Sequence, residues 1–263
     1  MGRLDIYLEQ ARLVALEAGR YLLDGLSAKK KIDYKGQVDL VTAYDRKSEE
    51  IIYEKLSRAF PDHSFLAEEE LSKDTDSDYC WIVDPLDGTT NFAHGLPIFC
   101  VSIALILKRE IIAGVVYDPN REEMFSATKG KGVYLNNEPV RVSETQELDK
   151  SLLATGFPYD VRVSPNNNLS HFSNFAVRAQ AIRRCGSAAL DLCYVACGRF
   201  DGFWEMKLKP WDLAAGALMV REAGGKITDL CGQEFEISSP DIVASNGLIH
   251  HSMLEIIRLG LVK

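Results

Sequence analysis

The chain has 263 residues and carries 30 lysine and arginine residues against 38 aspartate and glutamate residues, so its formal net charge is −8 at pH 7. This acidic balance argues against a general nucleic-acid-binding protein and against a polybasic membrane anchor, since both need a basic surface. The longest apolar run, Ile98 to Leu107, is much shorter than the ~20 residues that span a bilayer, so we expect no association with a membrane.

Helices open the chain and short strands follow. Apolar residues at helical spacing from Tyr7 to Leu22 predict an amphipathic N-terminal helix. A second helix is expected from Thr42, which has capping-box spacing to Asp45. After Pro61, short apolar runs separated by turn residues predict an antiparallel meander. Its expected strands cover residues 64–67, 80–83, 99–107, 111–117, 123–127 and 133–135.

Strands and helices alternate in the second part of the chain. The expected strands lie at 152–155, near 182, at 202–205, near 227 and at 242–244. The expected helices cover residues 170–179, 187–196, 213–223 and 253–259. Gly224-Gly225 supplies a C-cap signal for the third of these helices. The pattern predicts a mixed α+β architecture with layers of both elements.

The cysteines bear on the cellular compartment. None of the six forms a Cys-x-x-Cys pair. Cys193 and Cys197 share a face of a predicted helix, where two packed core thiols are favoured over a metal pair. Near the N-terminus, acidic residues interrupt any apolar stretch of the kind that forms a signal peptide. We therefore expect a cytoplasmic protein with reduced thiols.

The most informative segment is Trp81 to Phe92, where a hydrophobic strand runs into Asp84, Pro85 and Asp87 and then a Gly-Thr-Thr turn. Two carboxylates this close repel each other, and one protonates unless a cation lies between them. Hard oxygen ligands suit Mg²⁺ or Mn²⁺. A turn that opens a helix directs free amides at an anion. Cation ligands beside an anion cradle predict phosphate chemistry.

Structural roles remain open for each acid taken alone. Asp84 and Asp87 also fit turn and cap positions, and Asp212 fits a plain N-cap. Two further segments favour the chemical interpretation, because residues 65–70 form another strand that ends in carboxylates and Asp212 follows an aromatic residue at a helix start. The Asp-x-Asp-Gly-Thr motif of haloacid dehalogenase phosphatases has one residue between its acids. Two residues separate Asp84 from Asp87, so an aspartyl-phosphate mechanism is not expected.

Several segments together resemble the inositol monophosphatase family. Residues 81–92 resemble its first signature at every position, and residues 211–216 with 222–225 resemble its second. Residues 39–45 and the segment around Glu68 also fit, in the family's order. The resemblance covers nearly the whole chain and implies a lithium-sensitive, magnesium-dependent phosphatase. Residues 183–191 resemble the bacterial members in particular.

The resemblance also implies the architecture. The expected fold is the α-β-α-β-α layered sandwich shared by inositol monophosphatases and fructose-1,6-bisphosphatases, usually as a homodimer. One domain would cover residues 1–263, with a metal- and phosphate-binding half of roughly 1–150 and a substrate-binding half of 151–263.

By the same resemblance, the chain would hold two or three Mg²⁺ ions, for which Mn²⁺ is a substitute. Glu68, Asp84 and the backbone carbonyl of Leu86 would hold the first ion. Asp84, Asp87 and Asp212 would hold the second, and Glu68 would also contribute to a weaker third site.

The implied mechanism is hydrolysis by metal-activated water. Thr89 and Asp45 would accept the proton of that water in relay as it attacks phosphorus in line. Backbone amides of Gly88 and Thr89 would bind phosphate oxygens, and no covalent enzyme intermediate would form.

The alcohol part of the substrate would contact Asp87, Gly186, Ser187, Ala188, Glu205 and Asp212. The alternative for Glu205 is an exposed acid at the end of a strand, without a role. For Asp191, the alternative of a helix residue that pairs with a neighbouring side chain is favoured more strongly. Lys35 resembles a lysine near the third ion, although most lysines are simply solvated.

The resemblance thus predicts magnesium-dependent hydrolysis of myo-inositol 1-phosphate, a small phosphate ester, to myo-inositol and phosphate. A broader sugar phosphatase that also accepts fructose 1,6-bisphosphate is the alternative among enzymes. A regulatory binding protein on the same scaffold is the alternative outside them. The complete carboxylate set favours an enzyme, so a regulatory protein partner would be an added role.

Overall fold

The computed structural model describes residues 2–26, 32–34 and 40–260. Lys35 and Asp39, noted in the sequence, lie outside the described residues. The helices are α1 (Arg3–Gly25), α2 (Ala43–Ala59), α3 (Thr89–Ala93), the short 3-10 helix η1 (Leu148–Lys150), α4 (Leu169–Ala176), α5 (Ala188–Ala196), α6 (Pro210–Glu222) and α7 (His250–Arg258). Strands β1 (Ile32–Tyr34) and β2 (Leu40–Thr42) form a small antiparallel pair.

The larger sheet has the strand order β10-β9-β8-β7-β6-β5-β3-β4. Its strands are β3 (Ser64–Ala67), β4 (Ser72–Lys73), β5 (Tyr79–Asp87), β6 (Cys100–Leu107), β7 (Glu110–Asp118), β8 (Glu123–Thr128), β9 (Val133–Leu135) and β10 (Glu138–Val140). The expected meander is correct from β5 onward but wrong for β3, which runs parallel to β5. The chain returns through β4 before β5 begins, so both strands point the same way.

The smaller sheet has the order β12-β11-β13-β15-β14. It consists of β11 (Leu152–Thr155), β12 (Ala181–Arg183), β13 (Gly202–Glu205), β14 (Lys226–Thr228) and β15 (Ile242–Ser245). Strand β11 is parallel to both of its neighbours, β12 and β13, whereas β15 is antiparallel to both β13 and β14.

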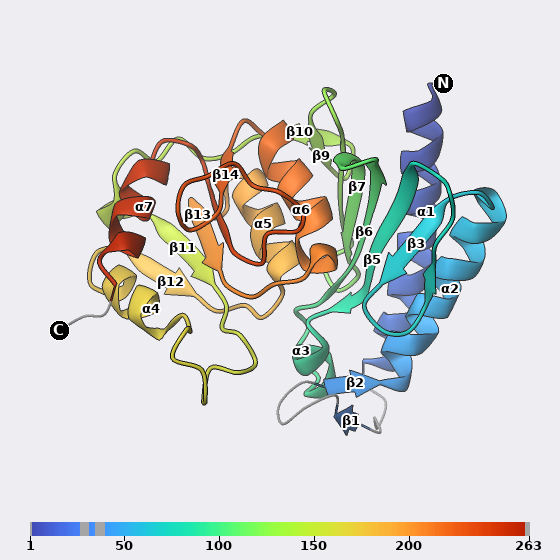
Figure 1. Ribbon diagram of the computed structural model, residues 1–263, viewed down its shortest axis with the longest axis horizontal. Helices are drawn as coiled ribbons and strands as arrows, with labels where there is room; N and C mark the ends of the chain where they lie inside the picture. The colour runs from blue at the N-terminus through green and yellow to red at the C-terminus, as the bar shows by residue number, and fades with distance from the viewer. Residues whose placement is uncertain (1, 27–31, 35–39, 261–263) are drawn as a thin grey trace.

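Helices and sheets alternate in five layers (Figure 1). Helices α1 and α2 cover the outer face of the larger sheet, α5 and α6 lie between the sheets, and α4 and α7 cover the outer face of the smaller sheet. The expected α-β-α-β-α sandwich is therefore confirmed.

The central helices are largely apolar because both of their faces are covered. Every residue of α5 is buried, including Cys193, whose Sγ lies 3.2 Å from Met219 Sδ. Helix α6 begins at Pro210, earlier than the expected residue 213, since proline fits the first helical position. Asp212 is consequently the third residue of α6, and the N-cap position that was an alternative for it is occupied by Lys209.

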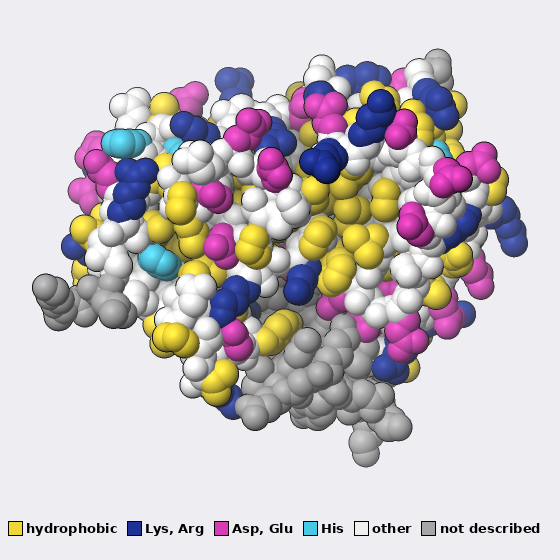
Figure 2. Space-filling model, viewed as in Figure 1, with side chains coloured by type: hydrophobic (Ala, Val, Ile, Leu, Met, Phe, Trp, Pro, Cys, Tyr) yellow, Lys and Arg dark blue, Asp and Glu magenta, His cyan; other side chains and the backbone are white. Residues whose placement is uncertain are grey.

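The surface carries both signs of charge. On the face shown in Figure 2, basic and acidic side chains are interspersed over the described surface, without a continuous basic band. Among the helices of residues 2–26 and 40–260, none is both long and apolar enough to cross a membrane.

Close packing of α6 on the larger sheet predicts the effect of enlarging Gly114. A Cβ at Gly114 would lie 3.1 Å from Ala215 Cα, on the helix whose first turn carries Asp212. Gly114→Val should therefore lower the free energy of unfolding by about 1–3 kcal/mol, and Gly114→Ala by less. Urea denaturation measures both. Wild-type stability of the valine variant would contradict this contact.

Candidate active site

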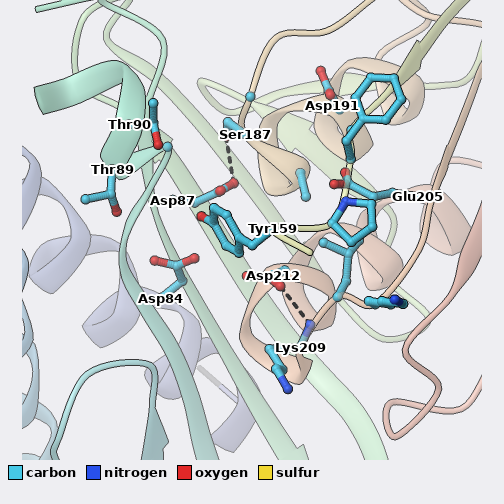
Figure 3. Close-up of a pocket in the computed structure, with 18 of the residues that line it drawn as sticks. Asp84, Asp87, Thr89, Thr90, Tyr159, Ser187, Asp191, Glu205, Lys209 and Asp212 are labelled. Carbon is cyan, nitrogen blue, oxygen red and sulfur yellow. Dashed lines mark hydrogen bonds between the residues drawn. The ribbon is translucent and has the colours of Figure 1, made fainter. Parts of the chain in front are cut away.

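A cavity of about 400 Å³ lies where the end of β5, α3, β13 and the first turns of α5 and α6 meet (Figure 3). It brings together nearly all the residues expected from the sequence. Its lining includes Glu68, Asp84, Leu86, Asp87, Gly88, Thr89, Gly186, Ser187, Ala188, Glu205 and Asp212. Asp45 is fully buried and bonded to Thr89.

A bulge at the end of β5 turns Asp84 and Asp87 toward the same cavity. Strict alternation would put residues three apart on opposite faces of a strand. The pairing with β6 shifts, so that Asp84 lies opposite Ser102 while Asp87 lies opposite Cys100. Pro85 lies within the bulge, where β5 does not pair with β6, so its missing N–H removes no hydrogen bond between these strands. The local Asp-Pro-Leu-Asp sequence thus creates a paired-carboxylate geometry.

The acids in the cavity raise one another's proton affinity. Burial raises the pKa of Asp84 well above its usual range, and the nearby charges of Glu68, Asp87 and Asp212 raise it further. Burial and the charge of Asp87 also raise the pKa of Asp212 well above its usual range. A cluster of this kind holds protons or cations near neutral pH.

Protein donors hold one oxygen of each of three aspartates. Leu86 N donates to Asp84 Oδ1 at 3.0 Å, and Lys209 N donates to Asp212 Oδ2 at 2.7 Å. Ser187 Oγ and Ala189 N donate to Asp87 Oδ2 at 2.6 and 2.8 Å. These bonds fix the carboxylates across the junction of the two sheets.

The donor set fits hard divalent cations. Buried carboxylate oxygens that repel one another, beside the Leu86 carbonyl, are the ligands that Mg²⁺ and Mn²⁺ prefer. Among the described residues, no three His, Cys, Asp or Glu side chains form a preassembled coordination group. The site is therefore an open cluster of suitable donors and not a closed ligand cage.

Thr89 and Asp45 form a buried hydrogen-bonded pair beside these acids. Thr89 Oγ1 lies 2.9 Å from Asp45 Oδ1 and 3.0 Å from the carbonyl oxygen of Leu86. Both the N–H and the hydroxyl of Thr42 donate to Asp45 Oδ2. The expected capping box of α2 thus also directs Asp45 at Thr89, which lines the cavity. Burial raises the pKa of Asp45.

The same face of α2 positions two other segments, which sequence reasoning missed. Ser48 Oγ donates to the carbonyl oxygen of Pro85 at 2.8 Å. Glu49, only 1% exposed, accepts hydrogen bonds of 2.7–2.9 Å from the backbone N–H groups of residues 69–71, just after Glu68. The spacing of Asp45, Ser48 and Glu49 along one helical stripe was the available signal.

Backbone geometry brings α3 close to the segment before α5. Gly88 has φ +99°, and a Cβ there would lie 2.9 Å from the carbonyl oxygen of Ile98. Asn91 Nδ2 donates to the carbonyl oxygens of Ile98 and Cys185, both at 2.8 Å. This bridge joins α3 to the segments that precede β6 and α5.

Glu205 lies inside the cavity wall. The alternative of an exposed strand-end acid is wrong, because Glu205 is buried at the end of β13. Burial, with a further contribution from Asp191, raises the pKa of Glu205 to about 8. A Cβ at Gly156 would lie 2.0 Å from Glu205 Oε1, so a larger residue there would require the Glu205 carboxyl group to move.

The lining also contains Tyr159, Lys207 and Lys209, which the motifs did not indicate, and Arg184 and Asp191, which lie in the 183–191 segment but were not among the expected site residues. Lys207 Nζ donates to Asp160 Oδ2 at 2.7 Å and to Ser164 Oγ at 3.0 Å. These contacts tie the 157–168 loop, whose residues 157–159 line the cavity, to the residues that follow β13, and only the folded loop reveals them.

Comparison with known proteins places this geometry in a family. The model of the Inositol monophosphatase family matches residues 4–259. The chain belongs to the inositol monophosphatase family. An inositol-1-monophosphatase of Synechocystis is 46% identical over 253 residues, covering 95% of this chain and 88% of the relative. A Neisseria meningitidis protein named putative Nus factor SuhB is 46% identical over 228 residues, covering 86% of this chain and 87% of the relative.

Solved structures of family members share the fold. The inositol monophosphatase structure from Anabaena superposes with a TM-score of 0.90 at 42% identity, covering 98% of each chain. The extragenic suppressor protein suhB of Bartonella henselae gives 0.93 at 42% identity, covering 97% of this chain and 100% of the other. The expected family and fold are therefore confirmed, and so is the expectation of a phosphatase.

The mutual repulsion of the acids predicts a pH-dependent effect of Asp84→Asn. The pKa of Asp84 is higher in the native state than in the unfolded state, so the unfolded state loses this proton first as pH rises. The free energy of unfolding therefore decreases as pH rises above about 4. Asparagine carries no such proton and still accepts from Leu86 N. In chelator, the variant should have the higher Tm at pH 8, and the two proteins should converge near the ordinary pKa of Asp. A more stable wild type at pH 8 would refute this.

Proposed function

We propose that this chain hydrolyses myo-inositol 1-phosphate to myo-inositol and phosphate with a divalent cation, Mg²⁺ by preference. The convergence of four carboxylates beside the Thr89–Asp45 pair carries the proposal. Glu68, Asp84, Asp87 and Asp212 come from three separate segments, the loop after β3, the end of β5 and the first turn of α6, and would serve no purpose as an unneutralised cluster.

The proposed ligands are Glu68, Asp84 and the Leu86 carbonyl for one cation, and Asp84, Asp87 and Asp212 for a second. Divalent cations held there would neutralise the cluster, lower the pKa of bound water and stabilise charge on the leaving oxygen. Hydrogen bonds from Ser187, Ala189 and Lys209 would keep Asp87 and Asp212 in place.

Thr89 and Asp45 are the proposed route for the proton of the attacking water. The Thr89 hydroxyl can pass its own proton to Asp45 Oδ1, 2.9 Å away, as it takes up another. Thr42 holds the second oxygen of Asp45, so the first stays directed at Thr89. The raised pKa of Asp45 favours its protonated form after the transfer.

Backbone amides and the second part of the chain would hold the ester. The N–H groups of Gly88 and Thr89 precede the first hydrogen bond of α3, from Phe92 N to Gly88 O, and can donate to phosphate oxygens. The alcohol part would lie against residues 186–188, Glu205 and Asp212. On this proposal, residues 1–150 supply most of the metal and phosphate contacts, and residues 151–263 supply most of the alcohol contacts.

A broader sugar phosphatase is the second candidate. Arg184, Lys207 and Lys209 line the cavity and offer cationic groups to a substrate with a second phosphate, such as fructose 1,6-bisphosphate. A regulatory role, as the name of the Neisseria relative indicates for that protein, would be additional.

Phosphate release distinguishes these functions. Purified protein should hydrolyse myo-inositol 1-phosphate with Mg²⁺ and not with chelator, and should prefer it to fructose 1,6-bisphosphate and adenosine 3′,5′-bisphosphate at equal concentration. Preference for another ester would support the metal site and refute the substrate. Failure to hydrolyse any of the three would contradict the proposed function and favour a binding role.

Variants test the assigned roles. Asp212→Asn and Thr89→Ala should each lower kcat by about 10²–10³-fold, since each removes a contact to the developing charge or the proton. Only Asp212→Asn should also weaken Mg²⁺ binding in calorimetry. Glu255→Gln, an exposed acid on α7, is the matched control and should retain wild-type kcat. A wild-type kcat in either site variant would contradict the role assigned to the residue that it replaces.

A further inference from the structure

Asp191 is a buried acid of the cavity that none of the roles above uses. It lies in the first turns of α5 and is 1% exposed. Its Oδ1 atom is buried and has no hydrogen-bond partner within the described residues. Figure 3 shows Asp191 and Glu205 on one side of the cavity, with Asp84 and Thr89 on the other.

Helix capping does not explain this side chain. Ser187 Oγ accepts from Leu190 N at 3.3 Å, and Asp87 Oδ2 accepts from Ala189 N at 2.8 Å. These two acceptors pair with backbone N–H groups in the first turn of α5, so Asp191 is not needed as a cap. The expected pairing of Asp191 with a helix neighbour does not account for its Oδ1 atom, which has no partner among the described residues. The carboxyl group interacts instead with the thiol of Cys185, which lies before α5 and is a weak donor.

The surroundings of Asp191 need a donor that the protein does not supply. Glu205, on the same wall, is a second acceptor, and Arg184 is the cation whose charge acts on both acids. An unpaired buried oxygen costs free energy until a partner occupies it. The hydroxyl groups of a polyol are donors of the right kind, and they would enter this cavity with the phosphate ester.

We propose that Asp191 accepts a hydrogen bond from a hydroxyl group of the substrate's alcohol part and makes the site selective for polyol phosphates. The inference rests on the proposed function, because it assigns the part of the ester that lies away from the phosphate. Asp191 and Glu205 together present hydrogen-bond acceptors on one wall of the cavity. An ester whose alcohol part has no hydroxyl group cannot donate to them.

The test compares two esters in the same protein. Asp191→Ala should lower kcat/KM for myo-inositol 1-phosphate by about 10- to 100-fold, mainly through a higher KM. Hydrolysis of p-nitrophenyl phosphate, which has no hydroxyl group, should change less than about twofold. Asp191→Asn keeps an acceptor oxygen and should restore part of the loss. Cys193→Ala, on the core-facing side of α5, is the matched control and should leave the ratio of the two kcat/KM values unchanged.

The outcomes separate the two proposals. An equal fall for both esters would show a structural role and overturn the assignment of Asp191, as would no change for either, while the proposed function would stand. A wild-type protein that hydrolyses neither ester would overturn the proposed function and the assignment of Asp191 with it.

Discussion

Electrostatic repulsion among buried carboxylates is the constraint on which the site depends. Asp84, Asp87 and Asp212 are held in one cavity, where burial raises the pKa of all three and neighbouring charges raise the pKa of Asp84 and Asp212 further. A fold that only had to be stable would place apolar residues there. The arrangement makes physical sense when cations compensate these charges, and the oxygen-only donor set is the one that hard divalent ions favour.

The surrounding scaffold holds these charges against their repulsion. Helix α2 directs one stripe of polar side chains at three segments: Asp45 at Thr89, Ser48 at the Pro85 carbonyl, and Glu49 at the loop after Glu68. Helices α5 and α6, packed between the two sheets, present their first turns to the cavity. Rigid elements thus set the geometry of a cluster that would otherwise spread apart.

Sequence alone predicted the parts of the site that local chemistry encodes. The segment from Trp81 to Phe92 carries its own bulge, turn and helix start, so its acids stood out. Contacts between distant segments were not predicted: Glu49 binds a loop about twenty positions on, and Ser187, expected only as a substrate contact, donates to Asp87 across a separation of 100 residues. The parallel pairing of β3 and β5 was missed for the same reason, since a short return through β4 sets the direction of β5.

The most direct test is to locate cations by anomalous diffraction from a crystal grown with Mn²⁺ and phosphate. We expect anomalous peaks among Glu68, Asp84, Asp87 and Asp212, with phosphate beside the amides of Gly88 and Thr89. We also expect the peak shared with Asp212 to weaken in Asp212→Asn. Absence of any peak among these carboxylates in a crystal with bound phosphate would contradict the central claim.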